Sequence, residues 1–249
     1  MINTLENIIK LGISKTEAIE LIKVSKNINK DYKLLTEGYP IQYLIGYVDF
    51  YGEKIIINKD VLIPRYETET LVEKTIQYLK ESKINNPKVL DLCTGSGCIS
   101  VALNNNINIS SLTCTDISSS ALKVVKENLD NNKIKADIIL SDMFKNIQQQ
   151  KFDLIISNPP YVPQDYNLSN IVSNEPINAI KADDNGSYYI KQIINEYPKY
   201  ASSSSLVAIE ICEDNLKTIK PLLDSKQINY TIEKDLTNKI RYIFIKNNL

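Results

Sequence analysis

From Lys88 onward, the chain alternates short apolar runs with segments whose apolar residues recur at helical spacing. Such alternation is typical of βαβ units, whose strands form a parallel sheet. We therefore predict an α/β fold with a mostly parallel sheet in a main domain of residues 68–249, which opens with an amphipathic helix from Thr68 to Leu79. The expected strands are KVLDL, SLTCTDI, DIILSD, FDLIIS and LVAIEI, and the expected helices begin near Gly97, Ser118, Gly186 and after LVAIEI.

The last two apolar runs break this alternation. YTIEKDL and IRYIFIKN are joined by the short turn Thr237-Asn238-Lys239. Parallel neighbours need a long crossover connection, whereas a short turn joins antiparallel strands. We therefore predict that these two strands pair antiparallel at one edge of the sheet.

The N-terminal part has a different pattern. Residues 1–38 carry apolar residues at helical spacing and are predicted to form a small helical domain in which Ser14 caps a helix. Residues 39–67 are rich in β-branched and aromatic residues, with Gly46 and Gly52 at the expected turns. We predict that this second segment is a β-hairpin linker.

The composition of the chain restricts which catalytic groups and which binding partners it can have. The 249 residues are 43% hydrophobic, carry a net charge of −1 and include no histidine. Without histidine there are no Ser-His or Cys-His nucleophile pairs and the commonest transition-metal ligand is missing, so we predict no metal site. The mixed charge gives no extended basic field for nucleic acid or a membrane surface. Scattered cysteines and the lack of a long apolar stretch predict a cytoplasmic protein.

A candidate ligand site follows the first strand of the main domain. VLDLCTGSGCIS places Gly95 and Gly97, two of only seven glycines, between a strand and a helix. Such a turn lets the backbone approach a ligand and points helix N-terminal amides at an anionic group. Asp116 ends the next strand, where its carboxylate can accept both hydroxyl groups of a ribose. The alternative is a tight turn without a ligand, and Ser100 departs from a dinucleotide fingerprint.

A further carboxylate follows the third strand of the main domain. In LSDMF, Asp142 can accept a hydrogen from an exocyclic amine, while Met143 and Phe144 offer apolar surface to a flat base. Alone, this acid is typical of an ordinary loop. Together with the glycine turn and Asp116, it predicts a pocket for adenosine.

The tetrapeptide Asn158-Pro159-Pro160-Tyr161 ends the fourth strand beside this predicted pocket. Proline fixes φ and lacks an N–H group, so this stiff backbone offers carbonyl acceptors without competing donors. The Asn158 side-chain oxygen and a proline carbonyl can hold both hydrogens of a planar NH2 group, and Tyr161 can stack on its face. A turn that merely ends the strand is the structural alternative.

These features favour transfer of a methyl group to a planar amine. An amide or aryl amine is a poor nucleophile because its lone pair is delocalised, so orientation and electrostatics must supply much of the catalysis. A sulfonium methyl donor suits such a site. The alkylated NH2 group becomes acidic and can release its proton to water or a nearby acceptor, so no histidine base is needed.

With these motifs, the chain resembles the class I S-adenosylmethionine-dependent methyltransferases and, within them, the bacterial release-factor glutamine N5-methyltransferases, the PrmC or HemK family. The resemblance runs from about Tyr39 to the C-terminus. It implies a Rossmann-like fold, S-adenosylmethionine as cofactor, and the glutamine of a Gly-Gly-Gln tripeptide in peptide-chain release factors as substrate. The stretches that carry it are YPIQYLIG, FYG, LIPRYETE, LDLCTGSGCIS, SNPPY and NEPINAI.

The resemblance also implies roles for individual residues. It assigns catalysis to Asn158, Pro159 and Tyr161, and substrate binding to the same three residues and Pro160. We expect residues 1–38, which precede the stretches that carry the resemblance, to recognise the substrate. The mixed charge and the lack of a long apolar stretch predict no direct contact with nucleic acid or membrane, and we expect a monomer. Donor binding is implied for Cys93, Thr94, Gly95, Ser96, Gly97, Asp116, Asp142, Met143 and Asn158.

Several residues near these motifs keep two interpretations. Arg65, Glu67 and Glu69 fit either the start of a helix, with Thr68 among its capping residues, or the wall of the donor site. Glu175 fits either a contact with the substrate backbone or the closure of its own loop.

Two other functions share part of this pattern. A nucleic-acid adenine-N6 methyltransferase needs the same amine cradle and flips its base into it. Such an enzyme usually carries a basic track for phosphates, which residues 1–38 and 163–185 do not supply. A nucleoside-binding regulatory module without catalysis is the other alternative, and the intact Asn158 and Tyr161 argue against it.

Overall fold

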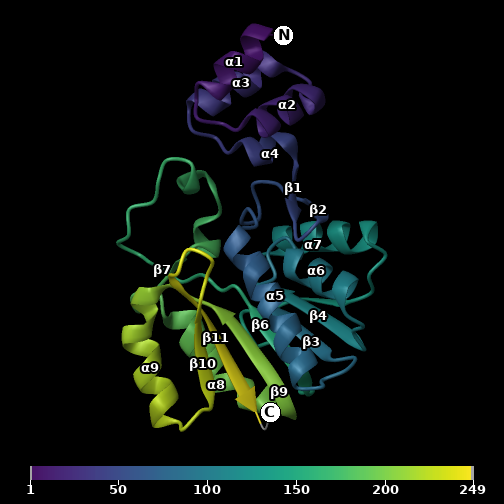
Figure 1. The fold of residues 1–249 in the computed structure, drawn as a ribbon, viewed down its shortest axis with the longest axis vertical. Coiled ribbons are helices and arrows are strands. Elements are labelled where there is room, and N and C mark those ends of the chain that lie inside the picture. Colours follow the sequence, from purple (N-terminus) through teal and green to yellow (C-terminus); the bar gives the residue numbers. More distant parts are fainter. Residues whose placement is uncertain (1, 248–249) are drawn as a thin grey trace.

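The computed structural model describes residues 2–247 of the chain. Residues 1, 248 and 249, which fall at the ends of two predicted domains, lie outside the described residues. Three parts follow one another along the long axis of the molecule: a group of helices, a short hairpin, and a large sheet flanked by helices (Figure 1).

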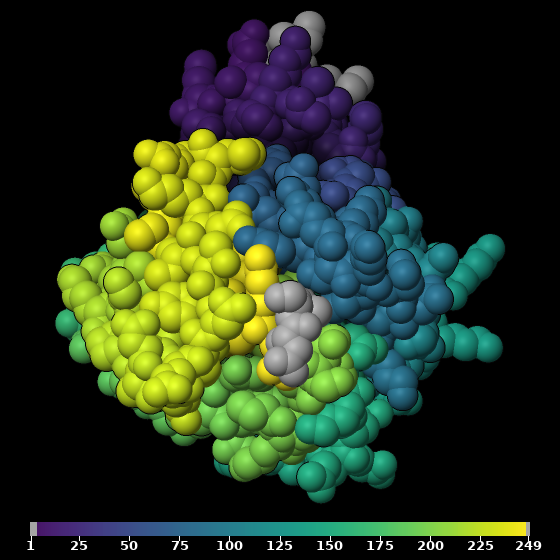
Figure 2. Space-filling model, turned by 60° about the horizontal axis from the view of Figure 1, so that its bottom comes forward, coloured from purple at the N-terminus to yellow at the C-terminus, as the bar shows by residue number. Residues whose placement is uncertain are grey.

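The N-terminal helices are α1 (Ile2–Ile9), α2 (Lys15–Val24) and α3 (Ile28–Thr36). Ser14 caps α2 as predicted, because its hydroxyl oxygen accepts a hydrogen bond from the Glu17 N–H. In the space-filling view these helices gather, in purple, at one end of the molecule (Figure 2). They share a small core of their own, which consists of the buried residues Ile8, Ala18, Leu21, Leu35 and Ile41.

The linker departs from the predicted β-rich pattern in its first residues. Residues Ile41–Ile45 form a short helix, α4, which ends where Gly46 takes the left-handed conformation at φ 87°. The Ile41 side chain is buried in the N-terminal core, so tertiary packing overrides the β propensity of this segment. The predicted antiparallel hairpin follows as β1 (Tyr47–Phe50) and β2 (Glu53–Ile56).

The main domain is built on a single large sheet. Its strands are β3 (Lys88–Leu92), β4 (Ser111–Asp116), β5 (Asp137–Leu140), β6 (Phe152–Ser157), β9 (Ala201–Glu210), β10 (Tyr230–Lys234) and β11 (Ile240–Asn247). The seven strands lie in the order β10-β11-β9-β6-β3-β4-β5. All neighbours from β9 to β5 are parallel, and β11 and β10 are antiparallel. The predicted α/β fold and its terminal antiparallel pair are confirmed.

Helices cover both faces of this sheet (Figure 1). Along β6, Leu154 and Ile156 belong to one core while Ile155 belongs to the other, as the two-residue period of a strand requires. Both faces are therefore apolar, which is expected for parallel strands buried on both sides. One face is covered by α5 (Tyr66–Glu81), α6 (Cys98–Asn106) and α7 (Ser119–Asn131), and the other by α8 (Tyr188–Tyr200) and α9 (Leu216–Ser225).

A long irregular segment connects β6 to α8. Its ends pair in parallel as β7 (Val162–Pro163) and β8 (Lys181–Ala182), and short 3-10 turns lie between them at Val172–Asn174 and Ile177–Ala179. We call residues 162–180 the β6–α8 loop. Throughout residues 2–247, no helix combines the length and the apolar character that crossing a bilayer requires.

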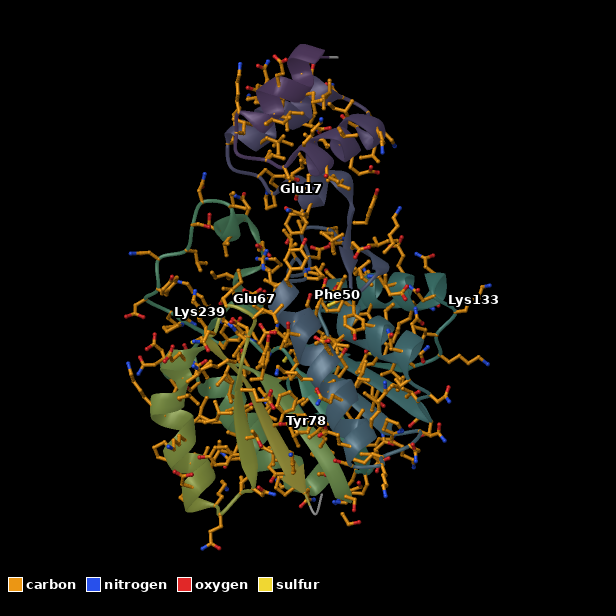
Figure 3. The ribbon with its side chains drawn as sticks, viewed as in Figure 1. Glu17, Phe50, Glu67, Tyr78, Lys133 and Lys239 are labelled. Atoms are coloured by element: carbon orange, nitrogen blue, oxygen red, sulfur yellow. The ribbon has the colours of Figure 1, made fainter. Side chains whose placement is uncertain are left out.

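The topology places a crevice at the carboxyl ends of the central strands. The chain leaves β3 toward β4 on one side and returns to β6 on the other, so the connections that follow β3 and β6 diverge. Open α/β sheets bind their ligands at such a switch point. Glu67, labelled in Figure 3, lies in the first turn of α5 at this edge of the sheet.

Candidate active site

Two cavities meet in this crevice. The first, which we call the strand-end cavity, is lined by residues that follow β3, β4 and β5, including Cys93, Thr94, Gly95, Ser96, Asp116, Asp142 and Met143. The second, which we call the loop cavity, is lined by Arg65, Pro159, Tyr161 and residues of the β6–α8 loop such as Tyr166 and Val172. Leu62, Asn158 and Ala179 line both.

The turn after β3 is fastened to the end of β4. The Gly95 N–H donates to Asp116 Oδ2 at 3.0 Å, and the Thr94 N–H donates to the Thr115 carbonyl oxygen at 3.0 Å. Gly97 adopts φ 80° just before α6, and a Cβ there would lie 3.4 Å from Val125 Cγ1 of α7. Gly97 is not among the residues that line the cavity. Its role in the structure is to allow the left-handed backbone conformation at the end of the turn.

Two buried polar atoms near this turn have no partner. Asp91 Oδ2 accepts hydrogen bonds from Thr94 Oγ1 at 2.7 Å and Ser100 Oγ at 2.6 Å. Among the described residues, Asp91 Oδ1 and the Oγ of Ser96 are buried without a hydrogen bond. Burial raises the pKa of Asp91 to about 6. Because unpaired buried polar atoms are costly, Ser96 Oγ indicates where a polar group of a ligand fits, since Ser96 lines the strand-end cavity. Asp91 is fully buried and is not among the lining residues, so it supports the turn from behind.

Asp116 faces the strand-end cavity from the end of β4. Its Oδ1 accepts from the Ser118 N–H at 2.9 Å, and its Oδ2 accepts from the Gly95 N–H at 3.0 Å. Burial raises the pKa of this carboxyl group. Each carboxylate oxygen keeps further acceptor capacity, so the side chain can still take two hydroxyl groups from a ligand.

Asp142 and Met143 line the side of the strand-end cavity that follows β5. The Asp142 carboxylate lies 2.5 Å from the Lys145 Nζ. Met143 is buried and has a positive φ of 51°, a conformation that places its side chain in the cavity wall. The charged and the apolar residue thus stand next to each other, as a purine ring with an exocyclic amine requires.

Phe144 does not take the position expected from the sequence. It is absent from the lining of the strand-end cavity and packs in the core, where it stacks on Tyr200 with ring centroids 4.7 Å apart. Tyr189 of α8 and Ile117 after β4 line the cavity instead. Sequence reasoning missed both, because an aromatic residue near a helix start and an isoleucine after a strand are common core residues.

Asn158 lies at the junction of the two cavities. Its Nδ2 donates a hydrogen bond to Thr68 Oγ1 of α5 at 3.0 Å. Pro159 and Tyr161 line the loop cavity, whereas Pro160, expected on the substrate side, lines the strand-end cavity. The tetrapeptide therefore forms the partition between the two spaces, and the side-chain oxygen of Asn158 is not used by the bond to Thr68.

A carboxylate that sequence reasoning missed lies behind this partition. Glu210, at the end of β9, is only 1% exposed and accepts hydrogen bonds from Thr68 Oγ1 at 2.8 Å and Tyr161 Oη at 2.9 Å. Burial raises the pKa of Glu210 to about 7 and raises that of Tyr161 as well. The signal in the sequence was a charged residue inside the apolar run LVAIEI, because such residues are rarely buried without a partner.

The backbone of the tetrapeptide is packed from behind. The Tyr161 carbonyl oxygen accepts from Asn215 Nδ2 at 3.2 Å. Gly186 lies so close that a Cβ there would stand 2.0 Å from the same oxygen. A side chain at residue 186 would displace the partition, which explains a glycine at this position.

Arg65 lines the loop cavity, and Glu175 holds the Arg65 side chain from behind. Glu175, 4% exposed, forms an ion pair with the Arg65 guanidinium and accepts from the Ile63 N–H at 2.9 Å. These contacts fasten the β6–α8 loop to the segment before α5, so Glu175 fixes a loop and Arg65 lines the cavity. Thr68 does not cap α5, because its hydroxyl group binds Glu210.

Comparisons with known proteins agree with this geometry. Residues 73–181 match the family model of the methyltransferase small domain. A release factor glutamine methyltransferase from Fusobacterium nucleatum is 33% identical over 97% of this chain and 69% of its own length. Another, from Thermodesulfovibrio yellowstonii, is 38% identical over 73% of this chain and 66% of its own length. The chain thus spans about two thirds of the length of these relatives.

A solved structure shares the fold at low identity. The T. thermophilus 16S rRNA N2 G1207 methyltransferase, solved in complex with AdoMet and guanosine, superposes with a TM-score of 0.59. The two chains are 15% identical, and the match covers 81% of this chain and 50% of the other. At this identity the likeness shows the fold alone, which is that of a class I methyltransferase.

Proposed function

The chain belongs to the release factor glutamine methyltransferase family, and from that premise we propose that it methylates the side-chain amide nitrogen, N5, of the glutamine in the Gly-Gly-Gln tripeptide of peptide-chain release factors. It is an enzyme that uses S-adenosylmethionine. The observation that carries the proposal is the position of Asn158 between two cavities. One of them suits a nucleoside, and the other suits an extended side chain.

The residues of the strand-end cavity fit S-adenosylmethionine. Ser96 Oγ lies in the cavity lining without a hydrogen-bond partner among the described residues, and the amino-acid part of this cofactor carries both donors and acceptors for it. We assign the ribose hydroxyl groups to Asp116 and the adenine amine to Asp142, beside the apolar surface of Met143. When bound, S-adenosylmethionine supplies an electrophilic methyl group on a positively charged sulfur atom.

The tetrapeptide supplies the grip on the glutamine amide. Asn158 Oδ1 and the Pro159 carbonyl oxygen each accept one hydrogen of the NH2 group, which directs its nitrogen toward the strand-end cavity. Pro159 and Pro160 have no N–H group to compete for these acceptors. Tyr161 covers the planar face of the amide and helps to exclude water from it. After transfer, the acidic proton on nitrogen leaves to water or to a nearby acceptor.

We also propose the division of the chain into a helical domain (1–38), a linker (39–67) and a methyltransferase domain (68–249). The separate core of the N-terminal helices supports a helical domain, and Ile41 at the start of the linker packs into the same core. Asn170 and Asn174 of the β6–α8 loop donate hydrogen bonds to the carbonyl oxygens of Glu37 and Gly38. The helical domain is thus joined to the wall of the loop cavity, where it can bind the release factor. The protein acts as a monomer in the cytoplasm, without direct contact with nucleic acid.

The experiment that tests this function compares three substrates with one labelled methyl donor. A release factor, its variant with alanine in place of the tripeptide glutamine, and duplex DNA are incubated in parallel with the protein. We expect label on the intact release factor alone. Label on the DNA, with none on the release factor, would overturn the proposal in favour of an adenine-N6 methyltransferase, which the names of the relatives do not favour.

A further inference from the structure

A buried chain of hydrogen bonds starts at Asn158 and ends at Glu210. Asn158 Nδ2 donates to Thr68 Oγ1 at 3.0 Å, and the same hydroxyl group donates to Glu210 Oε2 at 2.8 Å. Thr68 and Glu210 are 2% and 1% exposed, so water does not compete for these bonds. The three side chains come from the end of β6, the first turn of α5 and the end of β9.

The chemistry of the three groups fixes the direction of every bond in this chain. An ionised carboxylate can only accept hydrogen bonds, so Glu210 takes the single hydroxyl hydrogen of Thr68. The Thr68 oxygen is then left with lone pairs alone on its other side, and it can bind Asn158 only by accepting from the NH2 group. The Asn158 carboxamide is thereby held with its nitrogen toward Thr68 and its oxygen turned away.

We propose that Glu210 is a positioning residue that acts through Thr68 to turn the Asn158 carboxamide, so that Oδ1 and not Nδ2 faces the bound glutamine amide. This inference rests on the proposed function, because it explains how an acceptor is presented to the substrate NH2 group. An asparagine flipped by 180° would present a donor to those hydrogens and repel them. Glu210 touches neither substrate nor cofactor, and its effect on transfer is indirect.

A second branch of the same chain reaches Tyr161. Glu210 Oε1 accepts from the Tyr161 hydroxyl group at 2.9 Å, so one carboxylate fixes both side chains that contact the substrate amide. A glutamine at this position sets its oxygen against one hydroxyl group and its NH2 group against the other, so one of the two hydroxyl groups faces a donor and has to turn its own hydrogen away. The carboxylate accepts from both hydroxyl groups at once.

The kinetic test uses four variants: Thr68→Val, Thr68→Ser, Glu210→Gln and Tyr161→Phe. At a pH of about 8.5, where Glu210 is ionised, we expect Thr68→Val and Glu210→Gln to lower kcat about 10- to 100-fold, with the Kd of the methyl donor within about twofold of wild type. Thr68→Ser keeps the hydroxyl group, and its kcat should stay within about threefold of wild type. Full activity of Thr68→Val would overturn the proposal.

Two controls separate positioning from a general structural role. Thr75→Val removes a buried hydroxyl group from the same helix, where it binds only the Leu71 carbonyl oxygen, and should leave kcat unchanged. In the Asn158→Ala background, Thr68→Val should cause no further loss of kcat, because its target is gone. When Glu210→Gln is added to Asn158→Ala, kcat should fall by no more than it does when Tyr161→Phe is added to Asn158→Ala. Losses that multiply would instead show that Thr68 and Glu210 act independently of Asn158.

A measurement that needs no substrate completes the test. In the protein bound to the methyl donor, the Asn158 side-chain NH2 signals are assigned by comparison with Asn158→Ala. We expect their exchange with water to be slow in the wild type and in Thr68→Ser, and faster in Thr68→Val and Glu210→Gln. Unchanged exchange in both of the latter variants would overturn the positioning role. If the wild type transfers no methyl group but shows the expected exchange pattern, the proposed function fails and the positioning of Asn158 stands.

Discussion

The two cavities that share Asn158 are held together in different ways. One wall of the strand-end cavity is formed by the ends of β3, β4 and β5 and the turns that follow them, so the register of parallel strands fixes its position. The segment before α5 and the end of the β6–α8 loop complete the lining, through residues such as Leu62 and Pro176. The walls of the loop cavity come from the β6–α8 loop and the segment before α5. These are fastened by side chains, above all by the ion pair between Arg65 and Glu175.

This difference matches what each cavity has to bind. A small cofactor is bound by a rigid edge with a few fixed polar groups, and a sheet provides such an edge without further support. A segment of another protein must enter and leave, and loops on a rigid scaffold suit that task. Changes in one cavity should therefore leave the affinity of the other intact, except at Leu62, Asn158 and Ala179, which line both.

The largest effect is expected from Asn158→Ala, because it removes the one polar side chain that lines both cavities. Loss of a preorganised hydrogen-bond partner at the reacting group should lower kcat by about 100-fold or more. The Kd of the methyl donor and the KM of the release factor should each change by no more than about threefold. Calorimetry and steady-state kinetics measure these values.

The matched control for this prediction is Asn195→Ala, an exposed asparagine in α8, which should behave as wild type. A loss of donor affinity as large as the loss of kcat would show that Asn158 serves mainly the strand-end cavity.

The next largest effect is expected from Asp116→Asn, which changes the strand-end cavity alone. The amide that replaces the carboxylate sets an NH2 group against a backbone N–H, either that of Gly95 or that of Ser118. Loss of charged hydrogen bonds to the ribose should weaken donor binding about 30-fold, or about 2 kcal/mol. At saturating donor, the KM of the release factor should stay as in the wild type. A rise in that KM would contradict the independence of the two cavities.

Glu175→Gln makes the opposite test, on the loop cavity. The change removes the charge that pairs with Arg65 while the bond from the Ile63 N–H can remain. We expect the KM of the release factor to rise about tenfold, because the loop wall loses its fastening, with donor binding unchanged. The matched control is Glu233→Gln, which breaks the ion pair between Glu233 of β10 and Lys74 of α5. This variant should leave both values unchanged. Weaker binding of the methyl donor by Glu175→Gln would contradict the claim that the two cavities bind their ligands independently.

The smallest effect concerns pH and again distinguishes the cavities. Burial raises the pKa of Asp91 to about 6, so its carboxylate is lost as the pH falls through that value. Asp91 accepts a hydrogen bond from Thr94, which lines the strand-end cavity, so its protonation should loosen the turn and lower donor affinity about twofold between pH 8 and pH 6. Burial also raises the pKa of Asp116, which acts in the same direction. Isothermal titration should show a weaker pH dependence for Asp91→Asn, and an unchanged one would exclude this role.

Most of the residues that were placed together from the sequence do lie in the lining of the strand-end cavity, for a physical reason. Its residues follow consecutive parallel strands, and the carboxyl ends of such strands meet at one edge whatever the details of packing. The glycine turn, Asp116 and Asp142 could therefore be placed together before any contact was known. Phe144 shows the limit of this reasoning, because neighbours in the chain can point to opposite sides of a wall.

The loop cavity was less predictable, because it depends on contacts between residues far apart in the chain. Glu175 contacts Arg65 and Ile63, which precede it by 110 and 112 residues in the chain, and no local pattern in the sequence indicates that pairing. Glu210 supports Asn158 through Thr68, whose position beside two acids resembled a helix cap. The prediction of β structure at Ile41–Ile45, which form the helix α4, was wrong for the same reason. Ile41 packs in the N-terminal core, and this packing outweighs the β propensity of the segment.

The central claim is that Asn158 and Pro159 hold a glutamine amide by its two hydrogens at the meeting point of the cavities. A crystal structure with the demethylated donor product and a Gly-Gly-Gln peptide tests it most directly. We predict that the amide nitrogen lies within hydrogen-bond distance, about 3 Å, of Asn158 Oδ1 and of the Pro159 carbonyl oxygen, and faces the sulfur of the product. A glutamine side chain bound elsewhere, or with its oxygen toward Asn158, would contradict the account.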